Sequence, residues 1–248
     1  MAVLVTRPLP DSETTAADLR AQGFEVVTAP MLRFEPFGFN EEAEVPYGGI
    51  IVTSANAVRA VELQLAKSPL LKLPLFAVGE HTAAVARAAG FGNVFSADGD
   101  AIALRGLIIE AAKTKRFRKK SPLLYLAGEE ISRDLPGELR EKGFEVVTHI
   151  AYRMVPAKNL PDEVVDGFAA GRIQAVLHYS RRSAQAFVEA ARTGGVEISA
   201  LALPQCCISA AVAEIVREAG ATQVTVAARP DESALFEALK RALPARLA

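Results

Sequence analysis

The sequence predicts an α/β protein of two similar lobes, each a parallel five-stranded sheet with helices on both faces, joined by a two-stranded β linker. A long pattern occurs twice, as LRAQGFEVVT at residues 19–28 and as LREKGFEVVT at residues 139–148. Both copies continue through an arginine to a proline at the same spacing of 120 residues. Short apolar runs also alternate with helix-like stretches along the whole chain, which is typical of parallel sheets covered by helices. We interpret the chain as a duplicated unit.

The first copy shows how each element is predicted. The apolar run at residues 3–6 is typical of a short buried strand, and residues 11–22 form the next helix, capped by Asp11 or Ser12. Gly23 ends that helix, because glycine readily adopts the left-handed conformation of a helix cap. Residues 24–28, which favour β structure, then form a strand. Residues 31–36 are also extended but are separate from this strand, since Pro30 interrupts it.

The rest of the chain repeats the same alternation. In the second copy we expect strands at residues 123–127 and 145–148, a helix at 131–142 between them, and an extended segment at 150–155. The strand and following helix at residues 50–54 match those at 176–180, and the strands at 75–79 and 93–95 match those at 205–209 and 223–225. Helices starting near Ala101 and Ser233 complete the two sets.

Two divisions of the chain into lobes are compatible with the duplication. A plain tandem would cross between lobes once, near residues 113–121. The extended segments after both GFEVVT copies favour a crossed arrangement instead, in which residues 1–30 and 157–248 form one discontinuous lobe and residues 37–149 an inserted lobe. Residues 31–36 and 150–156 would then be linker strands that act as a hinge.

Composition excludes several classes of protein. The net charge is −1, so no overall field attracts nucleic acid or a membrane. The apolar runs are too short to span a bilayer, and the N-terminus lacks the basic start of a signal peptide. The two cysteines are adjacent and the three histidines scattered, so neither a disulfide framework nor a metal site is expected. These features predict a cytoplasmic protein without cofactor, metal, nucleic-acid or membrane partners.

The candidate site lies at the carboxyl ends of the strands, where open parallel sheets bind ligands. Small or polar residues follow nearly every strand and precede a helix, including Arg7, Thr53, Ser54, Thr82, Gly128, Arg133, Ser180 and Ser209. Free backbone N–H groups at the helix starts would make a distributed site for several carboxylates. The alternative is that these hydroxyl residues only cap their helices.

Tyr152 is the candidate catalytic residue. It lies in the second linker segment, where the first linker has Leu32. A phenol beside a cleft between lobes can give a proton or a hydrogen bond to a departing oxygen. The alternative is a half-buried strand tyrosine with a packing role. Glu129 and Glu130 could form an acid pair, or could simply favour the start of a helix.

These residues together resemble the uroporphyrinogen-III synthase family over essentially the whole chain. The resemblance rests on the order and spacing of several short motifs: VLVTRP at residues 3–8, IVTSxNAV at 51–58, VGxxTA at 78–83, LAGExxxR at 126–133, AYR at 151–153 and the serine-containing loops near the C-terminus. It implies two α/β lobes on a two-stranded ladder, the N-terminal segment completing the C-terminal lobe. That agrees with the crossed arrangement, which we adopt.

The resemblance also implies an activity. The family converts linear hydroxymethylbilane to uroporphyrinogen III, a step of tetrapyrrole and haem biosynthesis, by losing a hydroxyl group, inverting ring D and closing the macrocycle without a cofactor. By position, Tyr152 matches the tyrosine thought to assist hydroxide loss, Thr82 a substrate-contacting threonine, and Ser54 and Ser180 loop serines at the cleft. Residues 209–213 (SAAVA) depart from the family's usual GPTTA, so Ser209 would have to replace a lost hydroxyl contact.

Two functions therefore stand side by side, and the departure at residues 209–213 leaves open a third, a regulatory fusion or paralogue that keeps the fold without activity. The first is this cyclising, dehydrating lyase, expected as a monomer with the preceding or following pathway enzyme as a candidate partner. The second is a two-lobed protein that binds an anionic small molecule without catalysis. The isomer formed from hydroxymethylbilane distinguishes the two.

Overall fold

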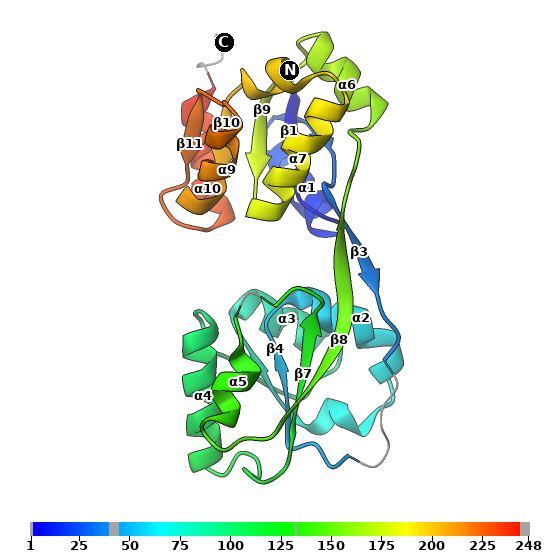
Figure 1. Ribbon diagram of the computed structural model, residues 1–248, viewed down its shortest axis with the longest axis vertical. Helices are drawn as coiled ribbons and strands as arrows, with labels where there is room; N and C mark the ends of the chain where they lie inside the picture. The colour runs from blue at the N-terminus through cyan, green and yellow to red at the C-terminus, as the bar shows by residue number, and fades with distance from the viewer. Residues whose placement is uncertain (1, 40–44, 132, 244–248) are drawn as a thin grey trace. The chain divides into compact units, whose positions relative to one another are not determined.

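The structure, a computed structural model, describes residues 2–39, 45–131 and 133–243. The chain folds into two compact units (Figure 1). The first combines Met1–Arg33 with Val155–Ala248, and the second is Phe34–Met154. The chain passes from one unit to the other within β3 (Leu32–Pro36) and within β8 (Val146–Pro156).

The first unit is built on a five-stranded parallel sheet in the order β11-β10-β9-β1-β2. Its strands are β1 (Ala2–Val5), β2 (Glu25–Thr28), β9 (Ile173–His178), β10 (Gln205–Cys207) and β11 (Val224–Val226). The N-terminal strand β1 lies between β9 and β2, although β9 is more than 160 residues away in sequence. This unit has the parallel five-stranded sheet predicted from the sequence.

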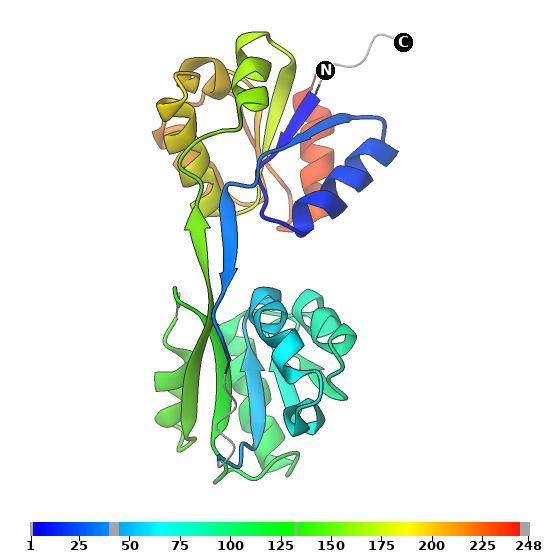
Figure 2. The same cartoon turned by 90° about the vertical axis from the view of Figure 1, so that its right-hand side faces the viewer.

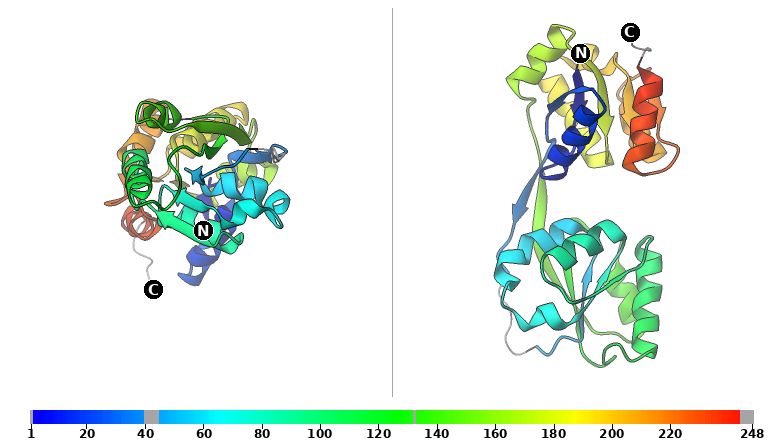
Figure 3. Two further views of the ribbon diagram at one scale, coloured as in Figure 1. Left: turned by 90° about the horizontal axis from the view of Figure 1, so that it is seen from below. Right: turned by 180° about the vertical axis from the view of Figure 1, so that it is seen from behind.

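Helices cover both faces of this sheet (Figure 2). One face packs against α6 (Asp162–Ala169), α7 (Arg181–Thr193), α8 (Glu197–Leu201) and α9 (Ala210–Glu218), and the other against α1 (Asp11–Ala21) and α10 (Glu232–Ala242). Along β1 the side chains alternate as strand geometry requires: Leu4 joins the first core, while Val3 and Val5 join the second. The view from behind in Figure 3 shows α1 in blue and α10 in red on their shared face.

The second unit has a six-stranded mixed sheet in the order β3-β8-β7-β4-β5-β6, which corrects the expected five parallel strands. Besides β3 and β8, its strands are β4 (Gly49–Val52), β5 (Pro74–Ala77), β6 (Asn93–Ser96) and β7 (Leu123–Gly128). The sixth strand is β3, which pairs with β8. The segments predicted separately at 145–148 and 150–156 are one strand, because no glycine or proline interrupts the chain between them.

The helices of the second unit also form two layers. The helices α2 (Ala55–Leu65) and α3 (Glu80–Ala88) pack on one face, near the short 3₁₀ helix η1 (Pro69–Lys72); α4 (Ala101–Lys113) and α5 (Leu135–Arg140) pack on the other (Figure 1). Helix α5 is shorter than the predicted 131–142. It begins after Asp134, whose carboxylate accepts a hydrogen bond from Gly137 N, and Pro136 occupies its first turn.

The duplicated motif has the same local structure in both units. Gly23 and Gly143 have φ angles of 83° and 80°, so both occupy the left-handed region that ends a helix. The glycine caps predicted from the repeated sequence are therefore correct.

Candidate functional site

A cavity of about 190 Å³ lies in the second unit at the carboxyl ends of β4 and β7. It brings together four residues predicted for the site: Thr53, Gly128, Arg133 and Tyr152. The rest of its lining consists of Val78, Ala101, Tyr125, Glu130, Ile131 and Leu135. These residues come from several loops and strands, so only the folded sheet assembles them.

Tyr152 reaches this cavity because of an irregularity between two strands. In the pairing of β7 with β8, Ala127 faces Ile150 but Gly128 faces Tyr152, so β8 has one extra residue at this point. The N–H of Glu129 then donates to the carbonyl of Tyr152 at 2.8 Å. Extra residues of this kind redirect side chains beside functional sites.

Gly128 provides the space for the phenol. A Cβ atom placed on Gly128 would lie 2.8 Å from Cζ and 2.9 Å from Oη of Tyr152, closer than such atoms approach. The ring of Phe34 lies on Tyr152 as well, with centroids 5.6 Å apart. Among the described residues, none forms a hydrogen bond with Tyr152 Oη. The hydroxyl is thus positioned by packing while its proton stays available.

A second phenol shares the cavity. The Tyr125 side chain is buried in β7, and its Oη lies 3.0 Å from Thr53 Oγ1. Burial raises the pKa of Tyr125 above the usual value for a phenol, and the neighbouring Tyr152 raises it further, while the bond to Thr53 acts in the opposite direction. Tyr125 therefore stays protonated at neutral pH.

Arg133 lies at the edge of the cavity and is already paired. Its Nε donates to Glu138 at 2.6 Å, and Arg105 donates to the other oxygen of Glu138 at 2.6 Å. The bond from Arg133 lowers the pKa of Glu138, and Arg105 contributes in the same direction. Any substrate bound by Arg133 would have to share this guanidinium with Glu138.

In the first unit, Arg7 follows β1 and is also compensated. Its guanidinium lies 3.3 Å from Asp11 and 3.2 Å from Glu232, and 4.8 Å from the centre of the Tyr179 ring. Glu232 also accepts hydrogen bonds from Thr15 and, at 3.0 Å, from Tyr179. Burial and this carboxylate raise the pKa of Tyr179. Two carboxylates thus balance Arg7, and its role toward substrate stays a prediction.

The candidate serines divide into two kinds. Ser54 accepts from Asn56 N at 3.2 Å and Ser180 from Ser183 N at 3.1 Å, so both cap the helices that follow. Ser209 precedes α9, and its side chain makes no capping bond. Gly79 precedes α3 and has no side chain that could cap the helix. Thr82 lies in the first turn of α3, with 6% of its surface exposed. Capping accounts for Ser54 and Ser180 but not for Ser209.

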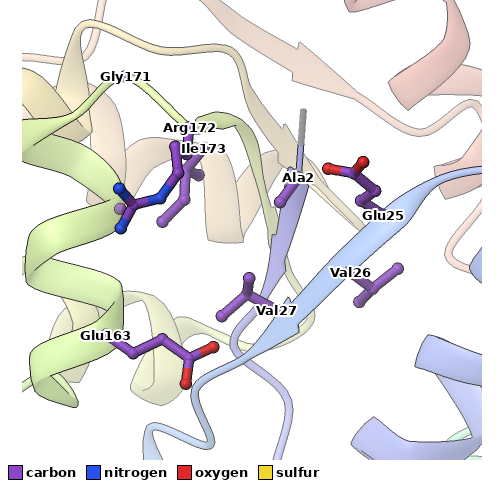
Figure 4. A pocket seen from close by; sticks show the side chains of 9 residues that line it. Ala2, Glu25, Val26, Val27, Glu163, Gly171, Arg172 and Ile173 are labelled. Carbon is purple, nitrogen blue, oxygen red and sulfur yellow. The ribbon is translucent and has the colours of Figure 1, made fainter.

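A larger cavity of about 530 Å³ lies elsewhere, at the amino ends of the strands in the first unit. Its lining includes Ala2, Glu25 and Ile173, the first residues of β1, β2 and β9. Figure 4 shows Val27 and Glu163 pointing toward one another across it, while Val26 points to the opposite side of β2. None of the predicted site residues lines this cavity.

Sequence reasoning missed Tyr125, Tyr179 and Glu232. Tyr125 lies within the apolar run LLYLA, and this pattern predicts a core residue. Its hydroxyl, in an otherwise aliphatic strand, was the one feature that could have indicated a site residue. Tyr179 directly precedes Ser180, and Glu232 belongs to the last helix; only folding brings both to Arg7.

Neither a metal site nor a membrane-spanning helix is found among the described residues. Within residues 2–39, 45–131 and 133–243, no group of three or more His, Cys, Asp or Glu side chains could hold a metal ion. No helix in this described part of the chain is both long enough and apolar enough to cross a membrane.

The fold and the site define a class: an α/β protein with a pocket of hydroxyl donors at the carboxyl ends of parallel strands, where such proteins bind ligands. The family described as "Uroporphyrinogen-III synthase HemD" matches residues 13–237. The chain belongs to the uroporphyrinogen-III synthase family, whose members are cyclising lyases of haem biosynthesis. The family resemblance and the expected enzymatic activity are therefore confirmed, and no finding favours the non-catalytic alternative.

Solved structures show the same fold. A uroporphyrinogen-III synthetase from Helicobacter pylori aligns with a TM-score of 0.65 and 18% identity, covering 97% of this chain and 98% of that one. A mutant uroporphyrinogen III synthase from Thermus thermophilus aligns with a TM-score of 0.56 and 18% identity, covering 98% of each chain. A comparison with curated proteins found no significant match.

Proposed function

We propose that this protein cyclises and dehydrates hydroxymethylbilane to uroporphyrinogen III with inversion of ring D, and that Tyr152 assists the loss of the hydroxyl group. The observation that carries this proposal is the cavity that holds Tyr152 against Gly128 with its O–H available, in a chain matched almost throughout by the synthase family.

The chemistry requires only modest help from the protein. As the C–O bond breaks, its electron pair leaves with oxygen, and the electron-rich pyrrole supplies electrons to the carbon. A proton from the Tyr152 phenol converts the departing hydroxide to water. The remaining work is to hold the flexible chain so that its two ends meet, which is catalysis by positioning.

The substrate's carboxylates need hydrogen-bond donors, and the two units provide them at corresponding places. The starts of α3 and α9 both follow a strand, and neither has a side-chain cap. Their first N–H groups can therefore bind acetate or propionate groups. Thr82 and Ser209 add a hydroxyl at each place. The other residues proposed to bind substrate are Thr53, Ser54, Gly128 and Arg133 in the second unit, and Arg7 and Ser180 in the first.

The test is the isomer formed from hydroxymethylbilane. Catalysis should yield the type III isomer, whereas spontaneous closure gives type I; formation of type I alone would refute the proposal. In the Tyr152→Phe variant, we expect kcat to fall by about 100-fold with unfolding temperature preserved, because only a proton donor is lost. Wild-type rates in that variant would remove Tyr152 from the mechanism.

The setting of the enzyme is also proposed. Cys206 and Cys207 are buried free thiols, which fits a reducing compartment such as the cytoplasm. We expect a monomer, which sedimentation would test, with transfer of substrate or product to a neighbouring pathway enzyme tested by co-purification.

A further inference from the structure

The cavity around Tyr152 contains a second source of hydrogen bonds. Tyr125 and Thr53 both line it, and their hydroxyl oxygens are 3.0 Å apart. Strands β4 and β7 pair in parallel with Ile51 beside Tyr125, so Thr53 lies two residues further toward the carboxyl end. The Tyr125 side chain must therefore lean along its strand toward the cavity to reach Thr53.

Counting protons shows what this pair can offer. Two hydroxyls carry two protons, and either oxygen can be the donor of their mutual bond. Whichever donates, the other O–H has no acceptor among the described residues. The ring of Tyr125 is buried in the core between the sheet and α4 and α5, so its position is fixed. The unused proton is consequently held at the wall of the cavity.

The charges around the cavity indicate what kind of group it accepts. Arg133 is the cationic residue of the lining and already donates to Glu138, and Glu130 is the acidic residue of the lining. A substrate carboxylate entering here would have to compete with Glu138 for the Arg133 guanidinium. A neutral oxygen would instead meet the hydroxyls of Tyr152 and of the Thr53–Tyr125 pair.

We propose that the Thr53–Tyr125 pair is a second hydrogen-bond donor to the departing hydroxyl group of the substrate, acting beside Tyr152. This inference rests on the proposed function. The proton that completes water still comes from Tyr152, and the pair stabilises the oxygen as negative charge develops on it while the C–O bond breaks. Tyr125 keeps its own proton, as its burial favours.

The Tyr125→Phe variant tests this directly, because it keeps the ring and removes only the hydroxyl. We expect kcat to fall about tenfold, with KM within about twofold of the wild-type value. The reason is that the variant loses one neutral donor, which acts mainly in the transition state. Thr53→Val, which frees the Tyr125 hydroxyl to rotate, should lower kcat by about threefold, and Thr53→Ser should restore it. Tyr47→Phe is the matched control: it removes a hydroxyl from another buried tyrosine of the same unit, outside the cavity.

The outcomes separate the two proposals. If wild type forms the type III isomer but Tyr125→Phe retains its kcat, the second donor is refuted and the function stands. An equal loss of kcat in Tyr47→Phe, or a loss that follows the unfolding temperature, would assign Tyr125 a structural role and also refute the donor. If wild type forms only the type I isomer, the proposed function fails and the donor proposal fails with it.

Discussion

Tyr152 and Gly128 illustrate how a catalytic side chain depends on the absence of another. A Cβ atom on Gly128 would lie only 2.8 Å from Cζ of the Tyr152 phenol. Gly128 does not have a left-handed φ angle, so the backbone itself tolerates a side chain there. The glycine is needed for the tyrosine, not for the turn.

Gly128→Ala should therefore reduce activity more than stability. The added methyl group pushes the end of a movable side chain, and displacement of a catalytic group by about 1 Å can cost about 100-fold in rate. We expect a fall of about that size in kcat, measured with hydroxymethylbilane, and a small change in unfolding temperature.

Gly106→Ala serves as the control for this substitution. Gly106 lies in α4, and a Cβ there would have no neighbour within 4 Å. The substitution should leave kcat unchanged and stabilise the helix by about 0.5–1 kcal/mol. Equal activities of the two variants would contradict our account of Gly128.

His178 is a buried residue whose protonation state is fixed by its surroundings. Gln205 donates from Nε2 to the carbonyls of Ala200 and Leu203, so its Oε1 faces His178 Nε2 at 2.8 Å. His178 Nε2 must then carry the proton, and Nδ1 is buried without a partner among the described residues. Burial lowers the pKa of His178 from 6.5 to about 4, against the opposing effect of Gln205.

The free energy of unfolding should consequently depend on pH through His178. Protonation of His178 is less favourable in the folded state than in the unfolded state. The stability linked to the neutral imidazole is therefore fully present above pH 6.5 and is lost as pH falls toward 4. The total loss is about 3 kcal/mol. Urea unfolding between pH 7.5 and pH 5 should show the decline, and His178→Gln should flatten it. An unchanged slope in that variant would assign the decline to other groups.

At the scale of the element, the helices that follow strands differ in how their first turns are satisfied. Ser180 caps α7 through Ser183 N, whereas the Ser209 side chain makes no capping bond at α9. The two serines occupy comparable loops of the same unit. Their different bonding predicts different roles.

Substitution by alanine should separate these roles. Ser180→Ala is expected to destabilise the protein by about 1 kcal/mol through loss of the cap. Ser209→Ala should change stability by less than about 0.5 kcal/mol and instead raise KM, because its hydroxyl is available to substrate. Thermal unfolding and steady-state kinetics on both variants provide the comparison, and a reversed pattern would contradict it.

At the scale of the molecule, the order of strands ties distant parts of the chain together. Strand β1 pairs with both β2 and β9, so residues 155–248 lack a central strand of their sheet unless residues 1–33 are present. The second unit is continuous in sequence from Phe34 to Met154. Among the residues that the structure describes, none from outside that range belongs to its cores.

Fragments should fold according to this division. We expect residues 34–154 to unfold cooperatively on their own, since their cores are complete. Residues 155–248 alone should remain unfolded, because β9 keeps β10 but loses β1, its neighbour at the centre of the sheet. A chain that joins 155–248 to 1–33 through a flexible linker should regain cooperative unfolding. Circular dichroism during heating distinguishes these cases, and a folded 155–248 fragment would refute the argument.

The amino-acid sequence by itself determined the local features of this protein. Glycines 23 and 143 end their helices, apolar runs form the buried strands, and serines at strand ends cap the next helix, because these depend on neighbours within a few residues. The repeat also indicated two related sheets, and the spacing of motifs indicated the family.

Tertiary structure alone decided which side chains meet. It joined β3 to the second sheet, placed Tyr125 beside Thr53, opened the space at Gly128 for Tyr152, and surrounded Arg7 with two carboxylates. These outcomes depend on strand order and on a one-residue shift in register, which bring together residues up to 225 positions apart. No local pattern encodes such contacts, since their energy exists only once the sheet has formed.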